Sequence, residues 1–135
     1  MAHRWSAVTG EHEYTRWGFR DLIRHRAVDV VQPDLMGAGG FSEALRIASL
    51  ASAFDVPVVP HAGGIYSYQF AMTQPGVPFV EYCITSPKGE EITSVFGDMF
   101  EGEPLPLDGT ITLSDAPGWG LKLNREAVRL RSFTA

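Results

Sequence analysis

The stretch VVQPDLMGAGGFSEALRIASLASAFDVPVVPH, residues 30–61, contains the pattern that decides the fold. It opens with an apolar run that Pro33 ends, passes through a glycine-rich loop into a helical segment, and closes with a second apolar run. Within 42–54, apolar residues recur every three or four positions, as in a helix with one buried face. A strand, a helix and a second strand in this order are typical of parallel strands joined by a crossover helix.

The same alternation continues on both sides of this stretch. Apolar runs separated by helical segments predict a series of parallel strands with crossover helices. Thr15 is the predicted N-cap of the first helix, because its hydroxyl is a good acceptor for backbone N–H groups. The predicted strands are 5–8, 28–32, 56–59 and 79–83, and the predicted helices are 15–27, 42–54 and 66–72.

The character of the chain changes at about residue 86. Proline, glycine and acidic residues accumulate there, and Asp108-Gly109 followed by TITL predicts a tight hairpin turn. A short helix is expected near the end of the chain. We therefore divide the sequence into a first part, 1–85, and an irregular tail, 86–135.

Composition narrows the classes of protein to which the chain can belong. Its 135 residues, 44% of them hydrophobic, predict a globular protein that buries a core. The net charge is -5 and the basic residues are not clustered into the stripes that nucleic acid requires, so we expect no nucleic-acid partner. No apolar run approaches the roughly 20 residues of a membrane helix. Cys83 is the only cysteine, which predicts a cytoplasmic protein without an intrachain disulfide.

An ionisable residue follows each of the first three predicted strands closely, and a fourth lies within the last strand. In a parallel sheet or barrel the carboxyl ends of neighbouring strands meet at one face, where catalytic groups gather. One polar residue at a strand end is often only solvated, but a set of four from consecutive strands favours a common pocket. The four residues are Glu11, Asp34, His61 and Glu81.

These residue types form a chemically coherent set. A histidine beside an aspartate can act as a general base whose orientation the carboxylate fixes. A glutamate with further oxygen ligands suits Mg²⁺, and a second, protonated glutamate could donate a hydrogen bond to a developing oxyanion. The GAGG segment at 37–40 lacks the rest of a phosphate-binding fingerprint, so a tight strand–helix connection is favoured over a phosphate cradle.

Three segments resemble the mandelate-racemase-like branch of the enolase superfamily. They are GEHEYTRWGF (10–19), the stretch 30–61 quoted above, and PGWGLKLN (117–124). The resemblance implies an α/β fold, comprising about strands five to eight of a TIM-type (β/α) barrel, followed by an irregular tail that packs on the barrel and on a capping domain. It also implies that the earlier strands, which carry two further metal ligands, and the capping domain lie outside this chain.

The resemblance also assigns roles to individual residues. Glu11 corresponds to the third Mg²⁺ ligand of the family. His61 corresponds to the base, Asp34 to its partner, and Glu81 to the residue that contacts the substrate carboxylate or its enolate. His12, next to the metal ligand, is a candidate substrate contact. The implied reaction is Mg²⁺-dependent dehydration of a sugar acid, by removal of the proton next to the carboxylate and loss of the 3-hydroxyl.

Other functions remain open at this level. Another acid-sugar dehydratase or a racemase of the same superfamily would share these residues, and a catalytically inert half-barrel would share the fold. We expect a small-molecule sugar acid as the partner of the complete enzyme, which we expect to be a homo-oligomer, with no nucleic acid and no membrane.

Overall fold

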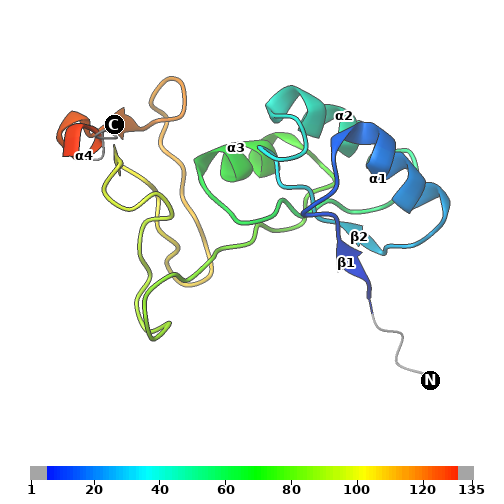
Figure 1. The fold of residues 1–135 in the computed structure, drawn as a ribbon, viewed down its shortest axis with the longest axis horizontal. Coiled ribbons are helices and arrows are strands. Elements are labelled where there is room, and N and C mark those ends of the chain that lie inside the picture. The colour runs from blue at the N-terminus through cyan, green and yellow to red at the C-terminus, as the bar shows by residue number, and fades with distance from the viewer. Residues whose placement is uncertain (1–5, 131–135) are drawn as a thin grey trace. The chain divides into compact units, whose positions relative to one another are not determined.

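The computed structural model describes residues 6–130, which belong to two units of the chain, Met1–Tyr82 and Cys83–Ala135. Figure 1 shows the helices and strands of each unit. Within the described residues, none of the helices has the length and apolar character needed to cross a membrane.

The first unit contains short parallel strands that follow one another in chain order. Strand β1 (Val8–Thr9) pairs in parallel with β2 (Val30–Val31), with Val8 opposite Val30 (Figure 1). Val31 also forms a parallel bridge with Val58, which lies in the next predicted strand. The predicted parallel order is therefore confirmed for three consecutive segments. The strands are shorter than predicted, and Trp5 of the first one lies outside the described residues.

Helices connect these parallel segments, as the periodicity predicts. Helix α1 (Thr15–Arg24) lies between the first two segments, α2 (Phe41–Ser52) between the second and third, and α3 (Ile65–Thr73) follows the third. Helix α1 ends earlier than predicted, because Arg26 takes a left-handed backbone conformation with φ 50° that a helix cannot continue.

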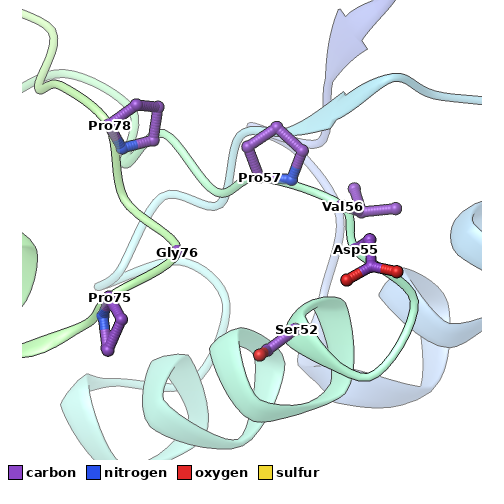
Figure 2. A pocket seen from close by; sticks show the side chains of 7 residues that line it. All are labelled: Ser52, Asp55, Val56, Pro57, Pro75, Gly76 and Pro78. Atoms are coloured by element: carbon purple, nitrogen blue, oxygen red, sulfur yellow. The ribbon is translucent and has the colours of Figure 1, made fainter.

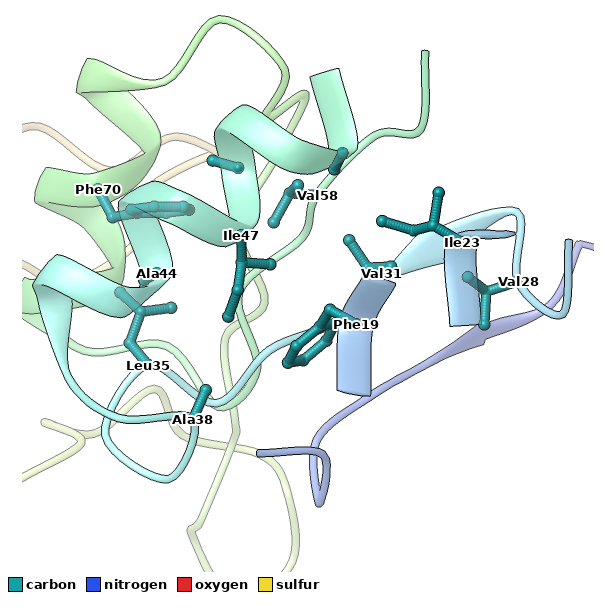
Figure 3. Packing of buried hydrophobic residues seen from close by; sticks show 12 residues of the cluster. Phe19, Ile23, Val28, Val31, Leu35, Ala38, Ala44, Ile47, Val58 and Phe70 are labelled. Carbon is teal, nitrogen blue, oxygen red and sulfur yellow. The ribbon is translucent and has the colours of Figure 1, made fainter. Parts of the chain in front are cut away.

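The apolar faces of α1 and α2 pack with the strand segments into one core. Figure 3 shows Ile47 of α2, Phe19 of α1 and the strand residues Val31 and Val58 in this cluster, and all four are almost completely buried. Phe70 of α3 extends the cluster, and it is fully buried as well. Burial of side chains of this size stabilises a fold by about 1.5–3 kcal/mol each. This core therefore holds the strand ends in fixed positions.

The start of α1 is held by neighbouring elements, and the prediction of Thr15 as its N-cap is wrong. Tyr14 is the N-cap residue and offers no side-chain hydrogen bond. The Thr15 N–H donates to the Ala38 carbonyl at 3.0 Å, and the Arg16 N–H donates to Glu43 Oε1 at 2.9 Å. Acceptors from outside the helix thus satisfy the N–H groups that a local cap would otherwise bind.

The strand predicted at 79–83 is not formed, although the residues are described. A strand exists only where its backbone forms a ladder with a neighbour, and in the described residues this segment has none. It is held instead by the Glu81 side chain, which accepts the Ala62 N–H at 2.6 Å.

The second unit contains a small antiparallel pair and a terminal helix. Strand β3 (Phe100–Glu101) pairs with β4 (Lys122–Leu123), and α4 (Arg125–Leu130) follows directly, as the predicted short final helix. The hairpin turn predicted at Asp108-Gly109 is confirmed, because both residues have positive φ and the backbones of the flanking residues exchange hydrogen bonds of 2.8 and 2.9 Å.

Candidate active site

His61 stands where the third parallel segment of the first unit ends. The Val59 N–H donates to the Val31 carbonyl, and the His61 N–H donates to the Pro33 carbonyl, both at 2.9 Å. The ladder between the two segments therefore continues as far as His61. It places the backbone of His61 beside the residue that follows Pro33, which is Asp34.

The imidazole of His61 lies between two carboxylates from different segments. Nε2 is 3.3 Å from Glu11 Oε2, and Nδ1 is 3.1 Å from Glu81 Oε2. Nδ1 is shielded from solvent and forms no hydrogen bond with any described group. The His61 side chain is 27% exposed, which leaves it accessible to a small molecule. Three of the four predicted site residues thus lie together.

Asp34 accepts hydrogen bonds within its own loop. Its Oδ1 accepts the N–H groups of Met36 at 2.9 Å and Gly37 at 2.7 Å, as an aspartate at the start of a turn commonly does. Within residues 6–130, no hydrogen bond or ion pair joins Asp34 to His61. The backbones of the two residues are neighbours, so orientation of His61 by Asp34 stays a prediction.

His12 points into solvent beside Glu11. Its side chain is 91% exposed, and its Nε2 is 3.4 Å from Glu11 Oε1. A shallow hollow of about 250 Å³ lies next to both residues. Among the described residues that line it, Glu13 is the one further charged residue, so a role for His12 in substrate contact stays a prediction.

The glycine-rich segment 37–40 forms a tight connection into α2. The Ala38 N–H donates to the Asp34 carbonyl at 2.8 Å, and the Gly40 N–H donates to the Leu35 carbonyl at 2.9 Å. Gly40 is the N-cap residue of α2, with φ 87°. These local bonds agree with a connecting role.

Glu11 offers the type of ligand that Mg²⁺ prefers, but the described residues do not complete a site. Mg²⁺ requires nearly octahedral coordination by oxygen atoms, usually from carboxylates and water. The Glu11 side chain is 43% exposed, so its carboxylate can accept a cation. Among residues 6–130, no group of three or more histidine, cysteine, aspartate or glutamate side chains is arranged to hold a metal ion. Within the described residues, Glu11 therefore fits the role of one ligand of such an ion.

Glu43 is a buried charge that the sequence pattern does not reveal. It is 8% exposed, and its carboxylate binds the guanidinium groups of Arg16 at 2.8 Å and Arg46 at 3.0 Å. The Arg16 backbone N–H and the Arg46 side chain hold the pKa of this carboxyl below its usual range, although burial opposes them. In the sequence, Glu43 and Arg46 look like an ordinary surface pair three residues apart on a helix. The contact with Arg16 of α1 is what shows that Glu43 joins the two helices.

Replacing Glu43 with glutamine is expected to lower the Tm of the chain by several degrees at pH 7, because two arginines lose their shared carboxylate. A depressed folded-state pKa stabilises the fold above the unfolded value, near 4.5, and this contribution is lost as the pH falls through the folded value. The difference between Glu43→Gln and wild type should therefore shrink below pH 4.5. Thermal unfolding followed by circular dichroism from pH 7 to pH 3 measures it.

The exposed ion pair of Arg20 and Asp21 provides the control, with Arg20 Nε 2.8 Å from Asp21 Oδ1. Asp21→Asn is expected to change the Tm little, since exposed pairs contribute weakly. An equal fall in Tm for Glu43→Gln and Asp21→Asn would contradict a larger contribution of Glu43 to stability.

The cavity shown in Figure 2 lies away from these side chains. It has a volume of about 430 Å³ and is found where the third parallel segment begins, whereas His61 lies where that segment ends. Among the described residues that line the cavity, Asp55 is the only charged one, so this lining offers no catalytic set. Its lining residues are Ser52, Asp55, Val56, Pro57, Pro75, Gly76 and Pro78.

Comparison with known proteins shows extensive similarity to L-rhamnonate dehydratases. The chain is 42% identical over 126 residues to the L-rhamnonate dehydratase of Saccharopolyspora erythraea, which covers 93% of this chain and 32% of that protein. The crystal structure of L-rhamnonate dehydratase from Gibberella zeae matches with 51% identity and a TM-score of 0.84, over 89% of this chain and 31% of the other. A structure of the Gibberella zeae enzyme complexed with Mg matches with 50% identity and a TM-score of 0.85, over 90% and 30% of the two chains.

The chain thus spans about a third of the length of these relatives. Its parallel α/β segments superpose on part of enolase-superfamily enzymes, which confirms the predicted fold class of a TIM-barrel portion. The protein family described as enolase C-terminal domain-like matches residues 3–127, nearly the whole chain. The chain therefore belongs to the enolase C-terminal domain-like family.

Proposed function

We propose that this chain forms the C-terminal part of a Mg²⁺-dependent hydro-lyase that converts L-rhamnonate to 2-keto-3-deoxy-L-rhamnonate. The observation that carries the proposal is the placement of His61 at a strand end, with Glu11 and Glu81 facing its two ring nitrogens at 3.3 and 3.1 Å. The similarity to two L-rhamnonate dehydratases, at 42% and 51% identity, supports the choice of substrate.

In this proposal His61 moves the protons of the reaction. As a general base it takes the proton from the carbon next to the substrate carboxylate, and the electron pair of that C–H bond becomes an enediolate. The protonated imidazole then gives its proton to the departing 3-hydroxyl, which leaves as water. The resulting enol rearranges to the 2-keto-3-deoxy acid, so atoms and charge balance without any oxidant or reductant.

The remaining residues orient the substrate and stabilise charge. Glu11 would supply one carboxylate ligand to Mg²⁺, whose charge lowers the cost of forming an enediolate. Glu81 would hydrogen-bond the oxygen that becomes negative. Asp34 would orient His61, and His12 would contact the substrate at the edge of the site. We also propose a cytoplasmic, homo-oligomeric complete enzyme.

A second reading, that the chain by itself is catalytically inert, is favoured by one observation. Among residues 6–130, no three metal-ligating side chains are arranged to hold a metal ion, so this part of the chain lacks a full ligand set for a tightly bound ion. The two readings are compatible if activity depends on protein segments beyond this chain. A different sugar acid within the same superfamily is the remaining alternative, and a substrate panel separates it.

We therefore expect the 135-residue chain alone to bind Mg²⁺ weakly and to release no keto acid from L-rhamnonate. Mg²⁺ gives up its waters reluctantly, and one carboxylate does not replace them. Adding the remaining N-terminal part of the Gibberella zeae enzyme, fused or in trans, should produce turnover. We call this assembly the completed enzyme. Calorimetric titration with Mg²⁺ and a keto-acid assay measure both expectations.

Two outcomes would contradict the proposal. Turnover by the isolated chain would mean that other residues hold the metal. A folded completed enzyme that releases no keto acid from L-rhamnonate would remove the proposed substrate, and turnover of another sugar acid in the panel would name its replacement.

A further inference from the structure

The three residues after His61 form a left-handed turn. Ala62 and Gly63 both have φ 66°, and Gly64 has φ 102°. Glycine adopts such angles freely, whereas alanine does not, because its Cβ approaches the following carbonyl oxygen. Ala62 therefore requires an external interaction that holds it in this conformation.

Glu81 provides that interaction, with both its side chain and its backbone. The Ala62 N–H donates to Glu81 Oε2 at 2.6 Å. The Glu81 carbonyl oxygen lies only 2.6 Å from the point where a Cβ on residue 63 would be, so the turn rests directly against the backbone of Glu81. The strand side of His61 is fixed separately, by its N–H bond to the Pro33 carbonyl. The conformation of Ala62 consequently sets the direction in which the chain leaves His61.

The same carboxylate oxygen also faces the imidazole. Glu81 Oε2 is 3.1 Å from His61 Nδ1, a nitrogen that is shielded from solvent and has no hydrogen-bond partner. Glu81 Oε2 thus accepts the Ala62 N–H and also restricts the space in which the His61 imidazole can lie. Asp34, the predicted partner of the base, is bonded to its own loop.

We infer that Glu81 is a positioning residue for His61, which holds Ala62 in its left-handed conformation and thereby fixes the imidazole at the end of its strand. The inference rests on the proposed function for the identity of His61 as the base. It goes beyond a contact between Glu81 and substrate, because a substrate contact alone would place no demand on Ala62.

The test combines two substitutions at Glu81 with Ala62→Gly. Glu81→Gln keeps an oxygen that can accept the Ala62 N–H, whereas Glu81→Ala removes it. Ala62→Gly makes the left-handed turn accessible without help, so it should restore part of what Glu81→Ala loses. In the 135-residue chain, hydrogen exchange at residue 62 and the ring-nitrogen chemical shifts of His61 are measured by NMR. In the completed enzyme, kcat and KM are measured for each variant.

We expect the amide of residue 62 to stay protected in wild type and Glu81→Gln and to lose protection in Glu81→Ala. The double variant Glu81→Ala/Ala62→Gly should return the His61 shifts toward wild type. It should also raise kcat about tenfold over Glu81→Ala. Glycine lacks the cost that alanine has in the left-handed conformation, and a cost of about 1.4 kcal/mol corresponds to this factor of ten. KM should change little between these two variants.

Unchanged protection in Glu81→Ala would overturn the inference, and so would a double variant whose His61 shifts stay those of Glu81→Ala. If Glu81→Ala does not fold, recovery of folding in the double variant supports the inference and its absence overturns it. If the completed enzyme is inactive throughout, the proposed function fails, while the NMR measurements still decide the role of Glu81.

Discussion

Replacing His61 with asparagine in the completed enzyme is expected to abolish dehydration while substrate binding largely survives. Asparagine can keep the backbone bond to Pro33 but cannot accept a proton, so the change removes a group that acts in the transition state. Loss of a general base costs about 10²–10⁴ in rate, and kcat should fall with little change in KM. Steady-state keto-acid release and calorimetric binding of L-rhamnonate measure the two effects.

His25→Asn is the matched control, because His25 is an exposed residue that follows the last turn of α1 and lies outside the proposed site. It should leave kcat and KM at their wild-type values. Ordinary turnover by His61→Asn would remove His61 from the mechanism.

Gly63→Ala is expected to destabilise the chain by about 3 kcal/mol, which combines left-handed strain of about 1–2 kcal/mol with the cost of forcing a group into a packed site. The new Cβ would lie 2.6 Å from the Glu81 carbonyl oxygen, and a backbone atom cannot move aside as the tip of a side chain can. Urea unfolding of the 135-residue chain, followed by tryptophan fluorescence, gives the change in free energy.

Gly89→Ala separates the two contributions. Gly89 has φ 68°, nearly that of Gly63, but a Cβ there would meet no atom within 4 Å. This variant should lose only the conformational part, about 1–2 kcal/mol. Equal losses at both positions would mean that the contact with Glu81 contributes nothing.

The sequence predicted the features that follow from chain order and periodicity. Apolar runs with helical segments between them indicated parallel strands, and parallel strands bring their carboxyl ends to one face. That argument alone places Glu11 and His61 together at the carboxyl ends of neighbouring strands. In the structure, Glu11 Oε2 lies 3.3 Å from His61 Nε2.

The features that the sequence did not predict depend on partners from distant segments. Thr15 satisfies the local rule for an N-cap, yet the N–H groups at the start of α1 bind Ala38 and Glu43 instead. Asp34 bonds to its own loop. The segment 79–83 has the composition of a strand but no ladder in the described residues. In each case a contact that periodicity does not encode decides the outcome.

The open side of β1 has a consequence for any protein segment that joins this chain. In the described residues β1 pairs only with β2, so a further strand could add along its other side. Side chains alternate between the two faces of a sheet, so an offset of one residue in that strand would turn its inward residues outward. An offset of two would keep the faces but move the strand end by about 6.6 Å relative to Glu11. The distance between Glu11 and a carboxylate on that strand is therefore set by the register in which the strand pairs with β1. Registers that keep the same residues inward differ by two residues, so this distance changes in steps of about 6.6 Å.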